Sequence, residues 1–300
     1  MKTKTYLFAL MTMALTLGSC SDNENGIGGE TSKYITVSTS IGNMTRVATD
    51  EKGGQTFEEG DEISVYAWTG DATVAPETRE RVVNNAINKL TNGSWISNPQ
   101  MLWKNNRDKH YFIGVYPISA ISDLSAGEYT FDETKQVESD LLVAVNKDGL
   151  SYNVDEQQPV PLTFTHVMAK LAVNLTYKNQ WGGIPTVEKV VVGNAAKEAT
   201  INYLTKVVTP STTAKEDFSL PEITENTKYV SVIIPQEDVT QLTIVIGGKN
   251  FVYDNGTPFK LESGKITTVN LEVGRDEIKL GDVKITNWED GSTFSGEALN

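Results

Sequence analysis

Cysteine and histidine are scarce in this chain: its 300 residues include one cysteine and two histidines, His110 and His166. A single cysteine excludes a disulfide within the chain and a cysteine-based zinc cluster. Neither histidine has a cysteine or another histidine close to it in sequence, so acid–base, nucleophilic and metal chemistry lack their usual groups. The glycine pairs lack a phosphate-cradling frame, and the acidic clusters lack EF-hand spacing. We therefore expect no enzyme, no catalytic residue, no cofactor and no metal.

Basic residues are also few. Lysine and arginine total 26 against 39 acidic residues, which gives a formal net charge of −13. An acidic surface of this size repels phosphate backbones, so nucleic acid is excluded as a partner. Hydrophobic residues make up 39% of the chain, and 24 glycines bring the apolar fraction close to that of globular proteins. The length is sufficient for two ordinary domains.

The N-terminus has the pattern of an export signal. Residues 1–19 begin with two lysines and continue with the apolar run Tyr6–Leu17, which is shorter than a membrane-spanning helix requires. The run ends at Leu17-Gly18-Ser19-Cys20, which resembles the lipobox of bacterial lipoproteins. That resemblance implies an acylated Cys20, carrying palmitate-type chains, and an outer-membrane anchor; the alternative is an ordinary signal peptide with a free cysteine. Residues 20–33 are polar and glycine-rich, which predicts a tether.

After the tether, the chain reads as β-structure. Alternating or β-branched runs recur, and hairpin signals such as Asn92-Gly93, Asp148-Gly149, Gly247-Gly248 and Asn255-Gly256 accompany them. Only Val82–Leu90 leaves a choice between a strand and a short helix. The predicted strands are Tyr34–Ile41, Ile63–Trp68, Tyr111–Tyr116, Leu141–Val145, Val160–Phe164, Leu171–Tyr177, Val187–Val192, Tyr229–Ile234, Leu242–Ile246, Phe251–Tyr253, Ile266–Val273 and Ile278–Ile285. The pattern predicts an all-β fold of two tandem β-sandwich domains, residues 34–166 and 167–300, with the boundary near Thr165–Ala169.

Four segments in a fixed order carry a family resemblance. They are Phe57–Tyr66 (FEEGDEISVY), Trp103 with Tyr111–Pro117, Asp140–Ala144 (DLLVA) and Leu162–Leu171 (LTFTHVMAKL). Together with the lipobox they resemble the fimbrillin-like proteins of Bacteroidales, the type V pilins. The resemblance implies two transthyretin-like β-sandwich domains and a role in surface fimbriae as stalk, tip or anchor.

Arg46 is a candidate maturation site. It is the only arginine between Cys20 and Arg79, and it follows the alternating strand Tyr34–Ile41 in a stretch typical of a loop. An arginine-specific protease that cut the Arg46–Val47 bond would remove the lipid and the first strand, exposing unpaired backbone groups that a strand of another subunit could fill. The family resemblance favours this interpretation; an ordinary solvated loop arginine is the alternative.

The C-terminus offers a candidate donor strand within residues 278–288. Ile278 and Leu280 share one parity, and Val283 and Ile285 share the other. Gly281-Asp282 stands where the phase changes, which predicts a bulge or a bend. These residues either enter another subunit or form the last strands of their own domain, and the sequence leaves both open.

Two functional hypotheses result. In the first, the chain is a fimbrial stalk or tip subunit that is exported as a lipoprotein, loses its first strand to an arginine-specific protease, and assembles with itself or related pilins for adhesion. In the second, it stays on the outer membrane as a lipoprotein and binds a glycan or host ligand through its β-sandwich domains without polymerising.

Overall fold

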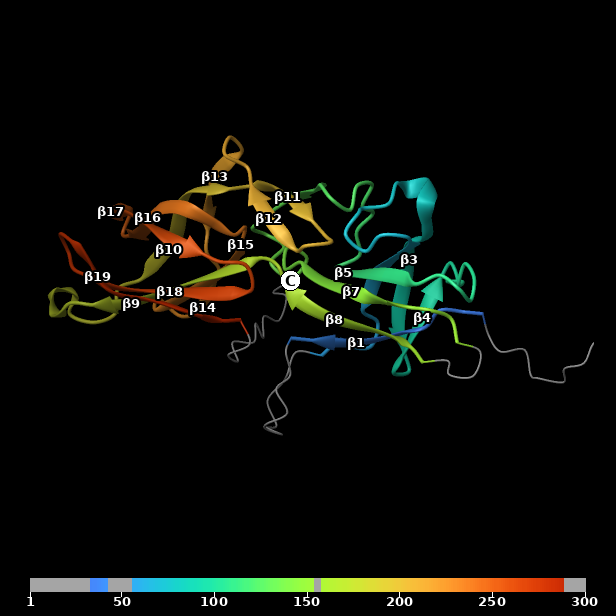
Figure 1. The fold of residues 1–300 in the computed structure, drawn as a ribbon. Coiled ribbons are helices and arrows are strands. Elements are labelled where there is room, and N and C mark those ends of the chain that lie inside the picture. Colours follow the sequence, from blue (N-terminus) through green and yellow to red (C-terminus); the bar gives the residue numbers. More distant parts are fainter. Residues whose placement is uncertain (1–32, 43–55, 154–157, 289–300) are drawn as a thin grey trace, which may run out of the picture. The chain divides into compact units, whose positions relative to one another are not determined.

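A computed structural model describes residues 33–42, 56–153 and 158–288. Within them the chain forms nineteen strands and two single-turn 3-10 helices, Thr78–Glu80 and Asn179–Trp181 (Figure 1). The all-β class predicted from alternating apolar residues is confirmed. No helix among these residues is long and apolar enough to cross a membrane.

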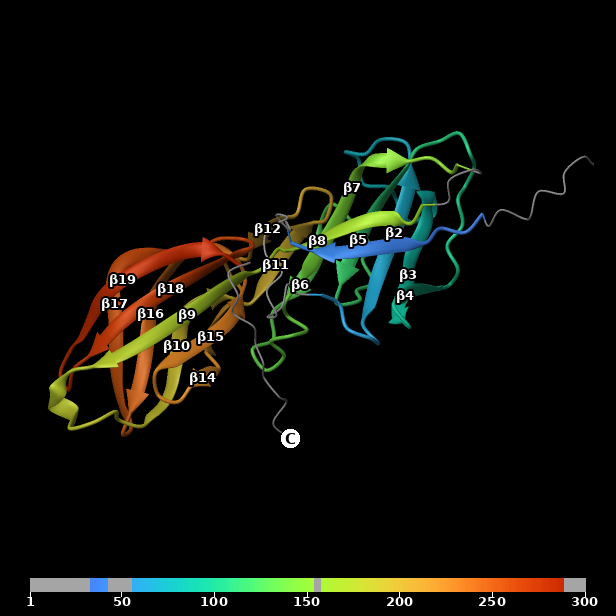
Figure 2. The ribbon, with the colours of Figure 1, turned by 90° about the horizontal axis from the view of Figure 1, so that it is seen from below.

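The first half of the chain forms a seven-stranded sheet (Figures 1 and 2). All neighbouring strands in it are antiparallel except β1 and β8, which are parallel. β1 is the end strand of this sheet and pairs only with β8 in the strand order. The two strands are far apart in sequence, so no hairpin connects them. In sheet order the strands are β1 (Val37–Ile41), β8 (Val160–His166), β7 (Leu142–Leu150), β5 (His110–Tyr116), β2 (Glu62–Thr69), β3 (Arg81–Thr91) and β4 (Ser94–Asn98).

The second half forms two further sheets. Their buried side chains belong to one hydrophobic cluster, as in a β-sandwich. The five-stranded sheet contains β14 (Glu222–Thr224), β15 (Lys228–Ile233), β9 (Ala169–Tyr177), β18 (Lys265–Val273) and β19 (Ile278–Asn287). The four-stranded sheet contains β13 (Lys215–Ser219), β10 (Val187–Ala196), β16 (Gln236–Ile246) and β17 (Lys249–Leu261).

A small third sheet joins strands from both sides of the predicted domain boundary. It has the order β12 (Val207–Pro210), β11 (Glu198–Asn202) and β6 (Gly127–Thr130). Beyond β6, the amide N–H of Ser219 donates to Glu133 Oε2 at 2.7 Å. Residues shortly after β6 are thus bonded to strands of the second half, while the two-domain division itself stays a prediction.

Turn chemistry explains which hairpin signals form hairpins. Asn92 and Gly93 both have positive φ, 51° and 72°, and join β3 to β4, as the Asn-Gly signal predicts. Val82–Leu90 therefore lies in a strand, β3. The Asp148-Gly149 signal is wrong as a hairpin: it lies within β7, where the register against β5 shifts, and Gly149 adopts φ 67° in a bulge.

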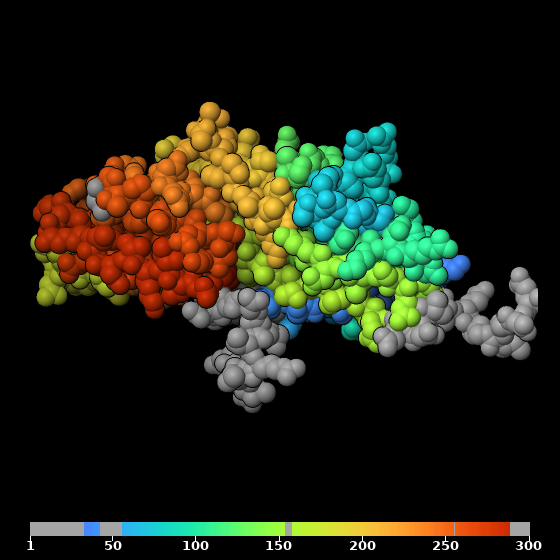
Figure 3. Space-filling view, viewed as in Figure 1, coloured from blue at the N-terminus to red at the C-terminus, as the bar shows by residue number. Residues whose placement is uncertain are grey.

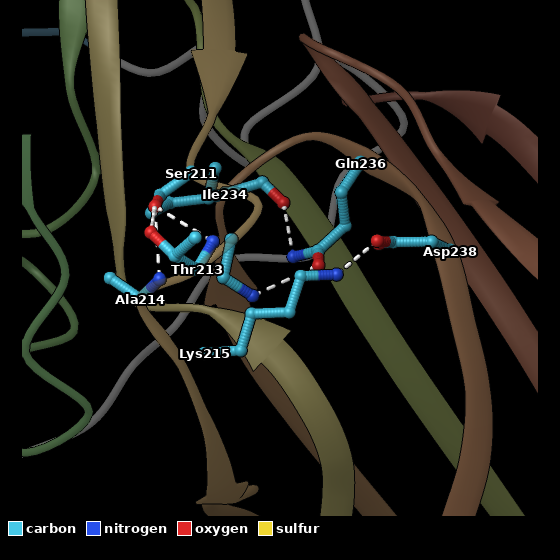
Figure 4. Close-up of polar contacts among 8 residues, drawn as sticks. Ser211, Thr213, Ala214, Lys215, Ile234, Gln236 and Asp238 are labelled. Carbon is cyan, nitrogen blue, oxygen red and sulfur yellow. Dashed lines mark hydrogen bonds and ion pairs between the residues drawn. The ribbon is translucent and has the colours of Figure 1, made fainter.

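Gln236 is a buried polar residue of the second half that finds its partners nearby. Gln236, at the start of β16, accepts a hydrogen bond from the Ala196 amide at 2.9 Å and donates one to the Ile234 carbonyl at 2.9 Å (Figure 4). Beside it, Lys215 and Asp238 form an ion pair. These contacts connect β16 to β10 and to β13, next to the register shift between β10 and β13.

Candidate functional site

The first described strand is attached to the sheet along one side. β1 runs parallel to β8, with Val37 opposite Val160 and Ile41 opposite Phe164. The pairing continues one residue further, because the Gly42 amide donates to the Phe164 carbonyl at 2.8 Å. In Figure 3, β1 (blue) is visible at the surface beneath the yellow-green β8.

The residues just before β1 pair on the opposite side. The Ile35 amide donates to the Met101 carbonyl at 2.9 Å, and the Trp103 amide donates to the Lys33 carbonyl at 3.2 Å. Residues 101–103 follow β4, the strand at the far end of the sheet order. Residues 33–42 therefore bridge the two ends of the same sheet.

Side chains of this segment alternate between inside and outside. Ile35 is 2% exposed and Val37 6% exposed, and both belong to the core of the seven-stranded sheet. Ile41 is half-buried and packs against the same core, whereas Ser38 and Ser40 face solvent. The odd-numbered side chains of residues 35–41 fill a space in this core. We use the name β1 slot for that space.

One inward position of the β1 slot is polar. Thr39 is half-buried, and its Oγ1 accepts a hydrogen bond of 3.0 Å from the indole Nε1 of Trp95 on β4. The ring of Phe57 packs edge-on against Trp95, Tyr116 and Phe164, with centroid distances of 5.3, 5.3 and 5.1 Å. This aromatic cluster fixes the indole that faces Thr39.

The predicted processing residues lie outside the described residues. These are the lipidation candidate Cys20 and the cleavage-site residues Arg46 and Val47. The described segment ends at Gly42, four residues before Arg46. Lipidation and cleavage stay predictions from the sequence.

The candidate donor strand, β19, is paired within its own chain. It lies at the edge of the five-stranded sheet, antiparallel to β18, so in this structure it folds back on a sheet of its own chain. Val269 faces Val283 and Leu271 faces Leu280, which leaves Gly281 and Asp282 opposite the single residue between them. The predicted bulge is confirmed, and Asn270 Nδ2 donates to Asp282 Oδ1 there at 2.6 Å.

Apolar side chains of β19 are unusually exposed. Leu280 and Ile285 are each 37% exposed and Val283 is 41% exposed, while Ile278 is half-buried. An edge strand with accessible apolar side chains and a free backbone edge is a surface that can pair with another chain. The strand thus contributes little to the core of its own sheet.

The end of β19 is fixed by one buried tryptophan. Trp288 stacks on the His166 imidazole, with centroids 4.2 Å apart and planes 8° from parallel, and Lys170 Nζ lies 4.3 Å from the indole centroid. His166 Nδ1 is 2.7 Å from Asp140 Oδ1. Burial lowers the pKa of Lys170 to about 8, although Asp140 opposes this shift. The C-terminal strand is thus followed directly by a tryptophan that packs on the His166 ring.

His110 is buried with both ring nitrogens bonded. Nε2 accepts the Lys104 amide N–H at 3.1 Å, and Nδ1 lies 3.1 Å from the Asp108 carbonyl, to which it donates. The Trp103 ring packs edge-on against it. This geometry satisfies the neutral ring, because a proton on Nε2 would face another donor. Burial lowers the pKa of His110, outweighing the carbonyl that raises it.

We expect acid to destabilise the fold through His110. Its folded-state pKa lies below the ordinary 6.5, so between those values the unfolded chain binds a proton that the folded chain lacks. The free energy of unfolding should therefore fall as pH drops below 6.5, by up to about 1.4 kcal/mol per pH unit, with no His110 contribution above it. Urea denaturation of the wild type and His110→Gln from pH 5 to 8 measures this. Equal pH slopes below 6.5 would contradict it.

An open groove lies at the end of β2 and the start of β3. Its volume is about 790 Å³, and its wall includes Trp68, Trp103, Lys104 and the exposed side chains Val74 and Leu102. Of its two tryptophans, Trp68 is buried and Trp103 is half-buried. Among the described residues, no group of three or more His, Cys, Asp or Glu is placed to hold a metal ion.

Comparison with known proteins identifies the family. The family model described as fimbrillin-like matches residues 45–288, most of the chain. The chain belongs to the fimbrillin-like family. This confirms the resemblance drawn from the four sequence segments. No curated protein matches this fimbrillin-like chain.

Solved structures share the fold of this fimbrillin-like chain. A protein of Bacteroides ovatus named for a proposed role in cell adhesion has 17% identity and a TM-score of 0.65, covering 85% of this chain and 98% of its own. A second of that description, from Bacteroides uniformis, has 18% identity, a TM-score of 0.63 and coverage of 86% and 100%. A fimbrial protein of Bacteroides vulgatus has 11% identity, a TM-score of 0.53 and coverage of 84% and 99%. At these identities the likeness concerns the fold.

Proposed function

We propose that this fimbrillin-like chain is a stalk or tip subunit of cell-surface fimbriae and assembles by strand exchange after losing its first strand. Membership of the family supports a pilin-type role in adhesion at the cell surface and association with other fimbrial subunits. Its partners are further copies of itself or related pilins.

The observation that supports this proposal is the pairing and burial of β1 in its own sheet. Residues 33–42 bridge β8 and residues 101–103 and bury Ile35 and Val37. If the segment left, the β1 slot would become an apolar groove bounded by unpaired N–H and C=O groups of β8. Such a groove accepts an extended strand through main-chain hydrogen bonds and alternate side chains.

The candidate donor is the C-terminal strand. Ile278, Leu280, Val283 and Ile285 lie on an edge strand, and the last three of these are more than a third exposed. Because the residues of β19 itself bury little apolar surface in their own sheet, their departure costs less than that of a central strand, and the main contact to be given up is that of the buried Trp288. This exposure supports donation of residues 278–288 to a neighbouring subunit.

Export and maturation complete the proposal. Acylation of Cys20 holds the precursor at the outer membrane, and several acyl chains give the stable attachment that one chain does not. An arginine-specific protease then cuts between Arg46 and Val47 and frees the β1 segment from the rest of the chain. Until that cut, β1 occupies its own slot and prevents premature pairing.

Arg46→Ala is expected to block both processing and assembly, because it removes the only arginine between Cys20 and Arg79. Arg79→Ala is the matched control: Arg79 is exposed and bonded only to its near neighbour Glu77 among the ion pairs of the described residues. Wild type and Arg79→Ala should polymerise on protease treatment, whereas Arg46→Ala should stay monomeric. Size exclusion with N-terminal sequencing measures both effects.

One result would favour the alternative function. Assembled or surface-purified protein that begins at Cys20, with β1 still paired to β8, would mean a chain that stays anchored. The open groove of about 790 Å³ beside Trp103 is then the place to seek a glycan or host ligand.

A further inference from the structure

The β1 slot contains one polar contact among apolar ones. Ile35, Val37, Thr39 and Ile41 point inward, and of these only Thr39 carries a hydrogen-bonding side chain. Its hydroxyl accepts from the indole of Trp95, which comes from β4 at the other end of the sheet order. The slot therefore presents a fixed donor to whatever strand occupies it.

An indole N–H can only donate, and its position here is set by packing rather than by the strand it contacts. Phe57 holds the Trp95 ring edge-on at 5.3 Å. A strand with an aliphatic side chain opposite Trp95 would leave this half-buried donor without a partner, which is costly compared with exposure to water. A strand with an acceptor there would satisfy it.

We propose that Trp95 selects the strand in the β1 slot by requiring a hydrogen-bond acceptor at the third inward position. We further propose that, after strand exchange, the occupant is the C-terminal strand of a second copy, with Val283, Ile285 and Asn287 replacing Ile35, Val37 and Thr39. The second part rests on the proposed function. The first part concerns β1 itself and holds in the intact chain.

The spacing of the apolar residues of β19 decides which pair can enter the β1 slot. In β19 the bulge at Gly281-Asp282 places Ile278, Leu280, Val283 and Ile285 all opposite odd-numbered residues of β18. A strand without a bulge, such as β1 in its pairing with β8, would instead put Ile278 and Leu280 on one face and Val283 and Ile285 on the other. Only one pair can enter the slot in phase. The first pair would bring the Asp282 carboxylate to Trp95, and desolvating a carboxylate is expensive. The second pair brings Asn287, whose neutral amide oxygen accepts equally well.

The three residues proposed to enter the β1 slot are accessible to solvent in the folded chain. Val283 and Ile285 are 41% and 37% exposed, and Asn287 is exposed at the end of the same edge strand. Moving them into the slot would replace partial burial of the two aliphatic side chains by the near-complete burial that Ile35 and Val37 have. Thr286, between Ile285 and Asn287, would point outward.

The first test uses the intact chain. Thr39→Val keeps the shape of the side chain but removes the acceptor, while Thr39→Ser keeps the acceptor. Hydrogen exchange at the amides of β1 should quicken about tenfold in Thr39→Val and change little in Thr39→Ser, since a lost buried hydrogen bond is worth about one order of magnitude. Equal exchange in the two variants would overturn selection by Trp95.

The second test uses the full chain after arginine-specific cleavage and release of its first strand. Synthetic Ile278–Trp288 peptide is the probe, with Asn287→Val as the acceptor-free version and Thr286→Val as the matched change on the outward face. Asn287→Val should weaken binding about tenfold and Thr286→Val much less. In the Trp95→Phe chain, which keeps an aromatic ring against Phe57, the penalty of Asn287→Val should disappear.

Each failure has a separate meaning. The same Asn287→Val penalty in wild-type and Trp95→Phe chains would overturn the pairing of Asn287 with Trp95. If the chain is not cut at Arg46, or if the cut chain binds none of the peptides, strand exchange fails and the proposed occupant fails with it. The hydrogen-exchange measurement on the intact chain still decides whether Trp95 selects the strand in the β1 slot.

Discussion

Trp288→Ala is expected to lower the free energy of unfolding by about 3–5 kcal/mol, the range for removing a large buried aromatic side chain. Trp288 is only 4% exposed, stacked on His166 and covered by Lys170. The apolar side chains within β19 are half-buried or exposed, so the Trp288 indole directly after the strand provides most of the burial that holds it. Its loss should free the C-terminal strand before the rest of the fold.

Trp288→Phe is the control that separates stacking from hydrogen bonding. The indole Nε1 of Trp288 is buried and has no hydrogen-bond partner among the described residues, so a phenyl ring loses area but no bond. We expect Trp288→Phe to cost far less than Trp288→Ala. Urea denaturation gives the stabilities, and hydrogen exchange at β19 amides reports release of the strand. An alanine variant as stable as the phenylalanine variant would show that the indole does not anchor β19.

Local patterns predicted most of the strands because a half-buried strand leaves a period-two signal. The alternation in Tyr34–Ile41 gave the inward face of β1, and glycine at a phase change gave the bulge of β19. Strands with little apolar content left no such signal. β13, for example, reads KEDFS and buries only Phe218, so it was not predicted.

Contacts between distant residues could not be predicted in this way. Thr39 and Trp95 are 56 residues apart, and nothing in either neighbourhood indicates the other. The stack of Trp288 on His166 likewise depends on how β9, β18 and β19 are arranged. The sequence predicts a domain boundary near Thr165–Ala169, which includes His166, but offers no reason to connect His166 with Trp288. The tertiary fold creates both contacts.

Gly114→Ala is expected to destabilise the protein by about 1–3 kcal/mol, the usual cost of overpacking a core. Gly114 lies within β5, and a Cβ there would come within 2.6 Å of Phe164 Cζ and 3.1 Å of Leu162 Cδ1. Both neighbours are on β8, the strand that carries β1. Phe164 is fully buried and packs against Phe57, so its ring has no free space to retreat into.

Because Phe164 pairs with Ile41 of β1 and packs in the same core cluster, Gly114→Ala should disturb β1 more than the rest of the sheet. Adding Phe164→Leu in the same chain shortens the clashing side chain, and the double variant should regain part of the stability lost by Gly114→Ala. Gly193→Ala is the comparison, since its Cβ would meet chiefly the flexible side-chain end of Gln241, at 2.8 Å. Thermal denaturation with hydrogen exchange at β1 measures both effects. If the double variant loses more unfolding free energy than the two single variants lose together, the Phe164 ring is not what the new methyl group contacts.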